Sequence, residues 1–359
     1  MMLPENTGLF LKVIISSEIF IKRRKFFSNM AKVILIKEHE LDGFEQMLEA
    51  GLKDKFKSGM KVAVKLHMGE GKGMFSPELA KRSVAVLKKL GCEPFMFDTI
   101  VLYPGPRHQK ASYKALAAEH GFTEEKTGCP VVISDDYVIV KTAHMAVEVS
   151  KEMAESDAML VLTHVKGHGC SGFGGAIKNL AMGCASPKSK KDQHKLGMPR
   201  MNDNCIACGT CASVCPFKAI TVDERAVVSE SRCWGCDNCF YNCPHNAIEI
   251  NVSFDILLAE AAFAALHAIK GKPVYYVNDA RRMTKDCDCF RDPGNPVVKD
   301  VGVLLCDDIV AVDKASLDLI NEQEGRNAFK EINHHDPCLL VKESEKIGFG
   351  KKDYSIERR

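Results

Sequence analysis

Apolar and polar residues alternate along this chain with two different periods from residue 32 onward. Short runs rich in Val, Ile and Phe predict strands, whereas apolar residues spaced three and four apart predict amphipathic helices. We expect strands over residues 33–37, 61–66, 94–97 and 158–163, and helices over 41–56, 77–90, 111–119 and 176–182. This alternation indicates an α/β fold, with a mostly parallel sheet and helices on both of its faces.

The alternation is less regular between residues 131 and 156, and it resumes after residue 250. Residues 131–134 and 137–141 are expected to form paired strands, and residues 145–156 a helix. Beyond residue 250 the pattern predicts helices over 254–269 and 313–321 and strands over 273–277 and 301–305. A segment of a different kind separates the two α/β blocks.

Residues 200–250 are rich in cysteine and internally repeated. The run Cys205-Ile-Ala-Cys208-Gly-Thr-Cys211-Ala-Ser-Val-Cys215-Pro is followed by Cys233-Trp-Gly-Cys236-Asp-Asn-Cys239-Phe-Tyr-Asn-Cys243-Pro. The spacing Cys-x2-Cys-x2-Cys-x3-Cys-Pro is typical of bacterial ferredoxins that bind two [4Fe–4S] clusters. The duplication predicts a small α+β, ferredoxin-like module with approximate twofold symmetry, inserted into the α/β domain.

The spacing also indicates which cysteines share a cluster, because in this arrangement the fourth cysteine of each half ligates the cluster of the other half. We expect one cluster on Cys205, Cys208, Cys211 and Cys243, and the other on Cys215, Cys233, Cys236 and Cys239. Such clusters transfer single electrons. Two zinc sites are the alternative, although zinc favours two Cys-x2-Cys pairs separated by a longer spacer.

These patterns divide the chain into five parts. Residues 1–29 form an extension of uncertain structure, 30–196 and 252–325 the two parts of the α/β domain, 197–251 the ferredoxin-like module, and 326–359 a C-terminal tail. Residues 9–20 are rich in apolar residues but interrupted by polar ones, and a basic run follows them, whereas in a secretory signal it precedes them. We therefore expect a cytoplasmic protein without a membrane segment.

The composition narrows the classes of function. The 49 Lys and Arg residues nearly balance the 47 Asp and Glu residues, and a net charge of +2 argues against nucleic-acid binding over a broad basic face. Half of the 16 cysteines lie in the two groups above, which is typical of metal ligation in a reducing compartment. A secreted protein held together by disulfides is thereby excluded.

Several polar residues directly follow predicted strands. Ligands of open α/β sheets bind beyond the carboxyl ends of the strands, so we expect a second site there. The candidate catalytic residues are Asp98, His164, Lys166, His168 and Asp307, and a His or Lys among them would donate a proton. His67 and Asp279 are further polar residues at strand ends.

A glycine-rich turn, Gly172-Phe-Gly174-Gly175, opens the helix predicted at 176–182. The N–H groups at such a helix start attract anions, and Lys178 would add positive charge. We expect Gly172, Gly174, Gly175 and Lys178 to bind a small anionic substrate, the alternative being a turn needed only for close packing. The segment matches neither the Walker loop nor the dinucleotide-binding fingerprint.

Cys287 and Cys289 form a Cys-x-Cys pair outside the module. Three interpretations are open: a third metal site, a redox-active dithiol, or two unreactive thiols. A metal would need further ligands, for which the candidates are Cys170, Cys306, His164, His168 and His194.

The order of these motifs resembles a known family. Lys-Gly-His at 166–168, Gly-Phe-Gly-Gly-Ala-Ile-Lys-Asn-Leu at 172–180, the doubled cysteine run, Cys-Asp-Cys at 287–289 and Asp-Asp-Ile-Val-Ala-Val-Asp-Lys-Ala-Ser at 307–316 are similar to the iron–sulfur centre proteins of the "domain of unknown function 362" family. Those proteins occur largely in anaerobic archaea and bacteria. The resemblance covers residues 30–325, with Ile309 where the family usually has Pro. It implies cluster binding and names no reaction.

Together these features predict an iron–sulfur protein that passes single electrons through two [4Fe–4S] clusters to or from an anionic-substrate site in the α/β domain. Such a ferredoxin-linked oxidoreductase would have a ferredoxin or a reductase as its redox partner, and an additional metal at Cys287 and Cys289 is one of the open interpretations. The alternative is a non-enzymatic protein that carries electrons, delivers a cluster or metal, or senses redox state while docking a partner.

Overall fold

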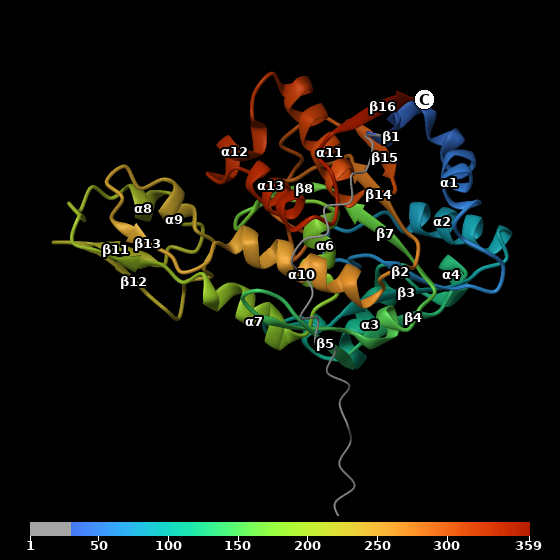
Figure 1. The fold of residues 1–359 in the computed structure, drawn as a ribbon, viewed down its shortest axis with the longest axis horizontal. Helices are drawn as coiled ribbons and strands as arrows, with labels where there is room; N and C mark the ends of the chain where they lie inside the picture. Colours follow the sequence, from blue (N-terminus) through green and yellow to red (C-terminus); the bar gives the residue numbers. More distant parts are fainter. Residues whose placement is uncertain (1–29) are drawn as a thin grey trace, which may run out of the picture.

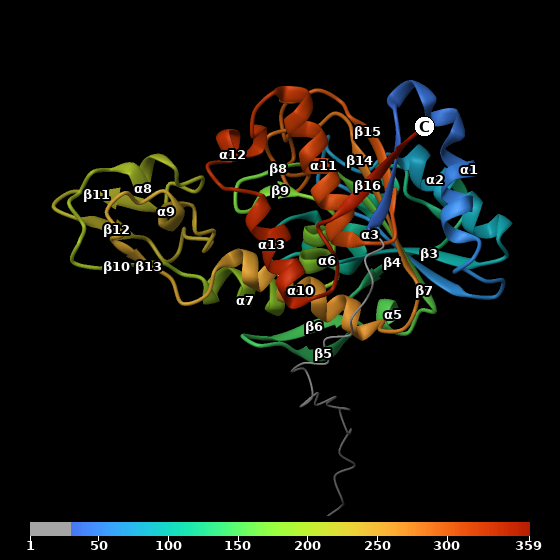
Figure 2. The same ribbon diagram turned by 45° about the horizontal axis from the view of Figure 1, so that its top comes forward.

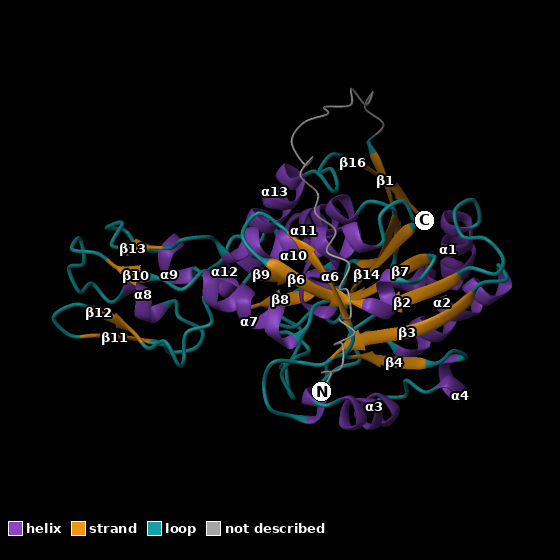
Figure 3. Ribbon diagram, turned by 60° about the horizontal axis from the view of Figure 1, so that its bottom comes forward, coloured by secondary structure: helices purple, strands orange, loops and turns teal. Residues whose placement is uncertain are grey.

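An eight-stranded sheet forms the centre of the molecule in the computed structural model, which describes residues 30–359 (Figures 1 and 3). Its strands, in spatial order, are β16 (Tyr354–Arg358), β1 (Ala31–Ile36), β15 (Gly302–Cys306), β14 (Val274–Ala280), β7 (Ala158–His164), β2 (Lys61–Lys65), β3 (Glu93–Thr99) and β4 (Val131–Ser134). Only the two ladders that involve β15 are antiparallel within this sheet. The α/β fold with a mostly parallel sheet is therefore confirmed, while the extension at residues 1–29 lies outside the described residues.

Helices cover both faces of the sheet (Figure 2). One face packs against α1 (Phe44–Leu52), α2 (Pro77–Lys89) and α3 (Lys110–Glu119), and the other against α6 (Ala176–Gly183), α10 (Phe254–Ala268), α11 (Ile309–Glu324) and α13 (Cys338–Ile347). Side chains alternate along each strand, so Met159 and Val161 of β7 enter one core and Leu160 and Leu162 the other. Burial on both faces explains the unbroken apolar run of this strand.

Residues 131–156 differ from the sequence-based expectation. β4 pairs with β3, and β5 (Tyr137–Lys141) pairs instead with β6 (Ala146–Ser150). The helix expected over 145–156 is therefore wrong for most of its length, with only the single turn α5 (Lys151–Ala154) following β6. The reason is the strand period of the segment, since Val147 and Val149 are both fully buried.

The C-terminal residues are part of the α/β domain, which corrects the expected tail at 326–359. After α11 the chain forms α12 (Ala328–Asn333) and α13, and then β16, which pairs in parallel with β1 at the edge of the sheet. The segment before the cysteine-rich region forms a helix, α7 (Pro187–Leu196), and Ser186 caps its N-terminus.

The cysteine-rich segment lies between α7 and α10 and projects from the α/β domain (Figure 1). It contains β10 (Arg200–Met201), α8 (Thr210–Ser213), β11 (Ile220–Val222), β12 (Ala226–Val228), α9 (Asn238–Tyr241) and β13 (Ile248–Glu249). β10 pairs with β13, and β11 with β12. Within residues 30–359, none of the helices has the length and apolar character needed to cross a membrane.

Candidate functional site

The two halves of the cysteine-rich segment repeat their backbone conformation as well as their sequence. Three pairs of residues at matched positions share a left-handed φ: Ala207 and Gly235 (57° and 55°), Gly209 and Asp237 (81° and 64°), and Lys218 and Asn246 (49° and 51°). This conformation is unfavourable for residues other than glycine. Because this conformation recurs at matched positions, the two loops have the same shape and can surround bound groups of the same kind.

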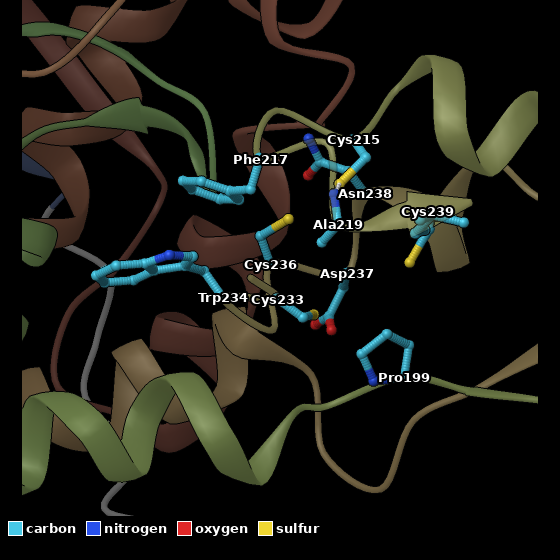
Figure 4. Close-up of a pocket in the computed structure, with 11 residues that line it drawn as sticks. Pro199, Cys215, Phe217, Ala219, Cys233, Trp234, Cys236, Asp237, Asn238 and Cys239 are labelled. Carbon is cyan, nitrogen blue, oxygen red and sulfur yellow. Dashed lines mark hydrogen bonds between the residues drawn. The ribbon is translucent and has the colours of Figure 1, made fainter. Parts of the chain in front are cut away.

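The eight cysteines of the segment line two hollows, four cysteines at each. The first hollow is lined by Cys205, Cys208, Cys211 and Cys243. The second is lined by Cys215, Cys233, Cys236 and Cys239 (Figure 4). Each half thus contributes its fourth cysteine to the other half's hollow, and these two sets coincide with the sets expected from the sequence spacing.

Backbone N–H groups are directed at several of these sulfur atoms. Ala219 N lies 3.2 Å from Cys215 Sγ, and at the matched position Ala247 N lies 3.3 Å from Cys243 Sγ. Further N–H groups reach Cys205 Sγ from Ala226 and Cys233 Sγ from Gly235, each at 3.4 Å. Hydrogen bonds to sulfur favour the thiolate form and tune the potential of iron–sulfur centres.

The arrangement of the thiols bears on which group they can hold. Across the described residues, no group of three or more His, Cys, Asp or Glu side chains is placed to hold a metal ion. The thiols of each set surround a hollow and do not meet at one point. Tetrahedral zinc needs four ligands at about 2.3 Å from a single ion, whereas a cubane binds its four thiolates at four separate irons. Four thiols around each hollow are the number of donors that one cubane requires.

The second hollow lies against the α/β domain. Asn238, which lines this hollow, donates from Nδ2 to Gly169 O and Asn333 O at 3.0 and 3.1 Å. Its Oδ1 contacts Nδ1 of the buried His335, whose Nε2 lies 3.0 Å from an Asp255 carboxylate oxygen. Burial lowers the pKa of His335, but the Asp255 carboxylate outweighs this and raises it overall.

Four parallel strands bring polar residues to one edge of the sheet, as expected. His67 follows β2, Asp98 lies near the end of β3, His164 ends β7, and Asp279 lies near the end of β14. Asp307 does not join them, because β15 runs antiparallel to β14 and its carboxyl end is at the opposite edge. There Asp307 forms an exposed ion pair with Lys55, so its assignment to this site is wrong.

Asp98 is buried in a network of charges. Its carboxylate lies 3.2 Å from Lys65 Nζ and 3.2 Å from an Arg107 nitrogen, and it accepts a hydrogen bond from the Tyr113 hydroxyl. Burial by itself raises the pKa of Asp98, but the two cations hold it at about 2. With 1% of its surface exposed, Asp98 fixes Arg107 and is not itself accessible to a substrate.

The Cys287–Cys289 turn lies across this sheet edge. Cys289 Sγ is 3.6 Å from His67 Nε2, which in turn lies 2.8 Å from an Arg107 nitrogen. Asp288 between the two cysteines is bound by His164 Nδ1 at 3.0 Å and Lys166 Nζ at 2.6 Å. His164 and Lys166 therefore hold the turn in place through Asp288.

His168 and Lys178 lie on the other side of the turn. His168 belongs to β8 (Lys166–His168), which pairs with β9 (Gly172–Gly174), and its Nδ1 accepts a hydrogen bond from Cys170 N at 3.1 Å. Lys178, in the first turn of α6, contributes positive charge at Cys287 and Cys289. Burial lowers the pKa of His168 well below its usual value, so this imidazole is neutral near pH 7.

The helix start predicted to bind an anion already holds one. The Asp313 carboxylate accepts from Ala176 N and Ile177 N at 2.7 and 2.9 Å, and from Asn278 Nδ2 at 2.8 Å. A Cβ at Gly175 would lie 2.4 Å from the same carboxylate. The turn at Gly172, Gly174 and Gly175 thus permits close packing, which favours the alternative interpretation of this segment.

Sequence reasoning missed Lys65, Arg107 and Tyr113, which surround Asp98, and it weighed His67 only as one polar residue among several. Arg107 comes from the segment after β3 and follows no period or motif. Lys65 leaves a signal, because it is a charged residue directly after the apolar run of residues 62–64. Cys170 appeared only as a metal-ligand candidate, but its thiol contacts the thiol of Cys236.

Comparisons with known proteins identify a family and two solved structures of distant similarity. A family profile described as domain of unknown function (DUF362) matches residues 62–318. The lactate racemase apoprotein from Thermoanaerobacterium thermosaccharolyticum aligns at 13% identity and a TM-score of 0.34, over 71% of this chain and 51% of that one. A protein from Thermotoga maritima aligns at 12% identity and a TM-score of 0.42, over 84% and 59%. The chain thus spans little more than half of either structure, and no curated protein matches it.

Proposed function

The chain belongs to the DUF362 family of domains of unknown function, and we propose that it holds two [4Fe–4S] clusters and exchanges single electrons with the site at the carboxyl edge of its sheet. The observation that supports this most strongly is the crossing of the cysteine sets, in which Cys215 and Cys243 each line the hollow of the other half. The matched left-handed residues and the matched N–H groups of Ala219 and Ala247 also support the proposal.

The residues of this chain would hold the clusters by their thiolates and stabilise them by the N–H groups that face sulfur. When bound, such clusters supply one-electron transfer. Phe217 and Trp234 stack with their ring centroids 5.7 Å apart and form an apolar wall of the second hollow (Figure 4), which keeps water from this side of the thiols. The Cys170 thiol of the α/β domain interacts with Cys236, one of the thiols of that hollow.

Metal analysis of anaerobically purified protein tests the proposal. We expect about eight irons and eight acid-labile sulfides per chain. Stoichiometric zinc in their place, or a protein that takes up no iron on anaerobic reconstitution, would overturn the assignment.

Pairs of substitutions test whether each cluster takes its ligands from both halves of the segment. The double variant Cys205→Ser/Cys243→Ser alters one set and should keep about four irons, whereas Cys239→Ser/Cys243→Ser alters both sets and should keep almost none. Cys338→Ser, a half-buried thiol of the α/β domain, is the matched control and should keep all of them. Retention of four irons by the Cys239/Cys243 variant would instead assign each cluster to a single half.

A carrier without catalytic activity is the second candidate, because the first hollow lies beside exposed apolar side chains. Ile206, which lines that hollow, is 64% exposed, and Val227 of the same segment is 56% exposed. Exposed apolar residues beside a redox centre are typical of a surface that docks a protein partner. A carrier would be reduced and reoxidised by proteins without any change in the thiols of Cys287 and Cys289.

A further inference from the structure

Cys287 and Cys289 present their thiols to each other on one tight turn. Phe290 N donates to Cys287 O at 3.0 Å, which closes the turn, and Cys289 N donates to Cys287 Sγ at 3.4 Å. The two thiols are close enough to shift each other's pKa, which rises for Cys287 and falls for Cys289. The carboxylate of Asp288 is held by His164 and Lys166, so it does not lie between the two sulfur atoms.

The turn is fixed from two directions. Glu70 N donates to Asp288 O at 3.1 Å from the loop after β2, and Gly167 N of β8 donates to Thr284 O at 2.8 Å. The loop after β2 approaches so closely that a Cβ at Gly71 would lie 2.0 Å from Arg291 O. A turn held this firmly keeps its two thiols adjacent.

The two thiols have different surroundings. Cys287 is 5% exposed, whereas Cys289 is half-buried and contacts His67 Nε2. The hydrogen bond from Cys287 lowers the pKa of the Cys289 thiol, and His67 and Lys178 act in the same direction against the effect of burial. An accessible thiolate with a second thiol directly behind it is the arrangement required for thiol–disulfide exchange.

The metal interpretation of this pair has less support. The candidate ligand His164 is bound to Asp288 and to Arg281 O, and Cys306 lies at the opposite edge of the sheet, where β15 ends. His194 Nδ1 lies 2.8 Å from Trp234 O, and its ring stacks on Phe254. Residues 30–359 contain no set of three potential ligands gathered for a metal.

We propose that Cys287 and Cys289 are a reversible dithiol–disulfide pair, and that the substrate of the sheet-edge site is a disulfide. The Cys289 thiolate attacks one sulfur of the substrate and forms a mixed disulfide with it, while the other substrate sulfur leaves as a thiolate and takes up a proton. Cys287 then attacks Cys289 Sγ, forms the Cys287–Cys289 disulfide and releases the remaining substrate sulfur as a thiol. Two electrons and two protons restore both thiols, with a low-potential one-electron carrier protein as the reductant.

This inference rests on the proposed function, because the reducing equivalents would enter through the inserted segment. The electron count agrees with it, since two one-electron centres together supply the two electrons that a disulfide takes up. The path between the two parts is short: Cys170 contacts Cys236, Cys170 N donates to His168 Nδ1, and β8 is bonded to the loop that carries the turn.

Peptide mapping of the anaerobic, cluster-loaded protein tests the pair directly. The protein is equilibrated in glutathione buffers of stepped ratio, alkylated and digested with trypsin, which releases Asp286–Arg291 with both cysteines and no other. We expect one transition with a two-electron slope, from a doubly alkylated peptide to an unalkylated peptide lighter by two hydrogens. Two separate glutathione adducts, or alkylation at every ratio, would overturn the proposal.

Variants separate this inference from the proposed function. Cys289→Ser should keep its full iron content and leave Cys287 alkylated or glutathionylated, and the control Cys338→Ser should show the wild-type transition. The oxidised wild-type pair should be reduced by dithionite at least tenfold faster in loaded protein than in the Cys239→Ser/Cys243→Ser variant. Full iron content without any disulfide transition would refute the dithiol pair and leave cluster binding intact, whereas a disulfide transition in protein that binds no iron would refute the proposed function.

Discussion

The thiol of Cys170 in the α/β domain contacts the thiol of Cys236 in the inserted segment. Cys170 lies in the loop between β8 and β9 and is 3% exposed, and Cys236 lines the second hollow. The contact raises the pKa of Cys170 and makes it the hydrogen-bond donor. A buried donor aimed at this sulfur makes the α/β domain part of the surroundings of one hollow and not of the other.

Replacement of Cys170 by alanine should therefore affect the two clusters unequally. A hydrogen bond to a cluster sulfur stabilises the reduced, more negative state, so Cys170→Ala should lower the midpoint potential of one cluster only. Iron content should be unchanged. A redox titration followed by electron paramagnetic resonance measures both midpoints, with Cys338→Ala as the control. Equal shifts of both midpoints, or no shift, would contradict the prediction.

Asp98 should matter for stability through the charges it neutralises. Asp98→Asn leaves the buried Lys65 without its counter-charge and Arg107 with only Glu70, 3.6 Å away, and we expect a loss of about 3 kcal/mol in the free energy of unfolding at pH 7. The pKa of about 2 in the folded protein lies below the usual value of about 3.9. The stabilisation is therefore complete above about pH 4 and is lost as the pH falls through about 2.

Urea denaturation at pH 7 and pH 3 measures this difference. The gap between wild type and Asp98→Asn should be smaller at pH 3, because the wild-type carboxylate has by then lost part of its contribution. Asp135→Asn, in an exposed pair with Lys110, is the control and should change stability by less than about 1 kcal/mol. An equal gap at both pH values would show that the charge of Asp98 is not the cause.

The cysteine sets could be predicted from the sequence because their geometry is local. With two residues between successive cysteines, the first three thiols of each half face one hollow. The single helical turn before Cys215 or Cys243 directs the fourth thiol to the hollow of the other half. The contact between the two halves follows from the same repeated spacing. The left-handed φ of Ala207 and Asp237 could not be predicted in the same way, since both residue types usually avoid it.

The sheet-edge site was only partly predictable, because it depends on the direction of strands and on distant partners. The sequence of residues 301–305 does not reveal that β15 runs antiparallel to β14. Because of this strand direction, Asp307 lies at the opposite edge of the sheet. Asp313 fills the start of α6 from another helix, although 137 residues separate it from Ala176. Apolar periodicity locates strands, but it does not give their order or their partners.

Gly71 should be essential to the position of the Cys287–Cys289 turn. An added Cβ would lie 2.0 Å from the backbone oxygen of Arg291, so Gly71→Ala must displace the turn, and we expect a loss of about 2 kcal/mol in stability. The rate at which oxidised glutathione forms the Cys287–Cys289 disulfide should fall as well. Gly43→Ala, with no atom within 4 Å of the added Cβ, is the control and should change neither quantity. Normal stability together with normal disulfide formation in Gly71→Ala would contradict the close approach.

Ile206 should carry part of the contact with the protein that donates electrons. It is 64% exposed beside the first hollow, and a carboxylate at this position would disfavour an apolar interface. In Ile206→Asp, we expect reduction by a ferredoxin to be slower by about tenfold, which corresponds to about 1.4 kcal/mol. Reduction by dithionite should be unchanged, because a small reductant needs no docking surface.

Stopped-flow absorbance in the visible range distinguishes the outcomes for Ile206. The matched control is Val297→Asp, which alters an apolar residue of the α/β domain that is 38% exposed, and its reduction by either reductant should match wild type. If dithionite also reduces Ile206→Asp slowly, the substitution has disturbed the first hollow and not a docking contact. If neither rate changes, the donor binds at a different surface of the chain, and the exposed apolar residues of the inserted segment must have another partner.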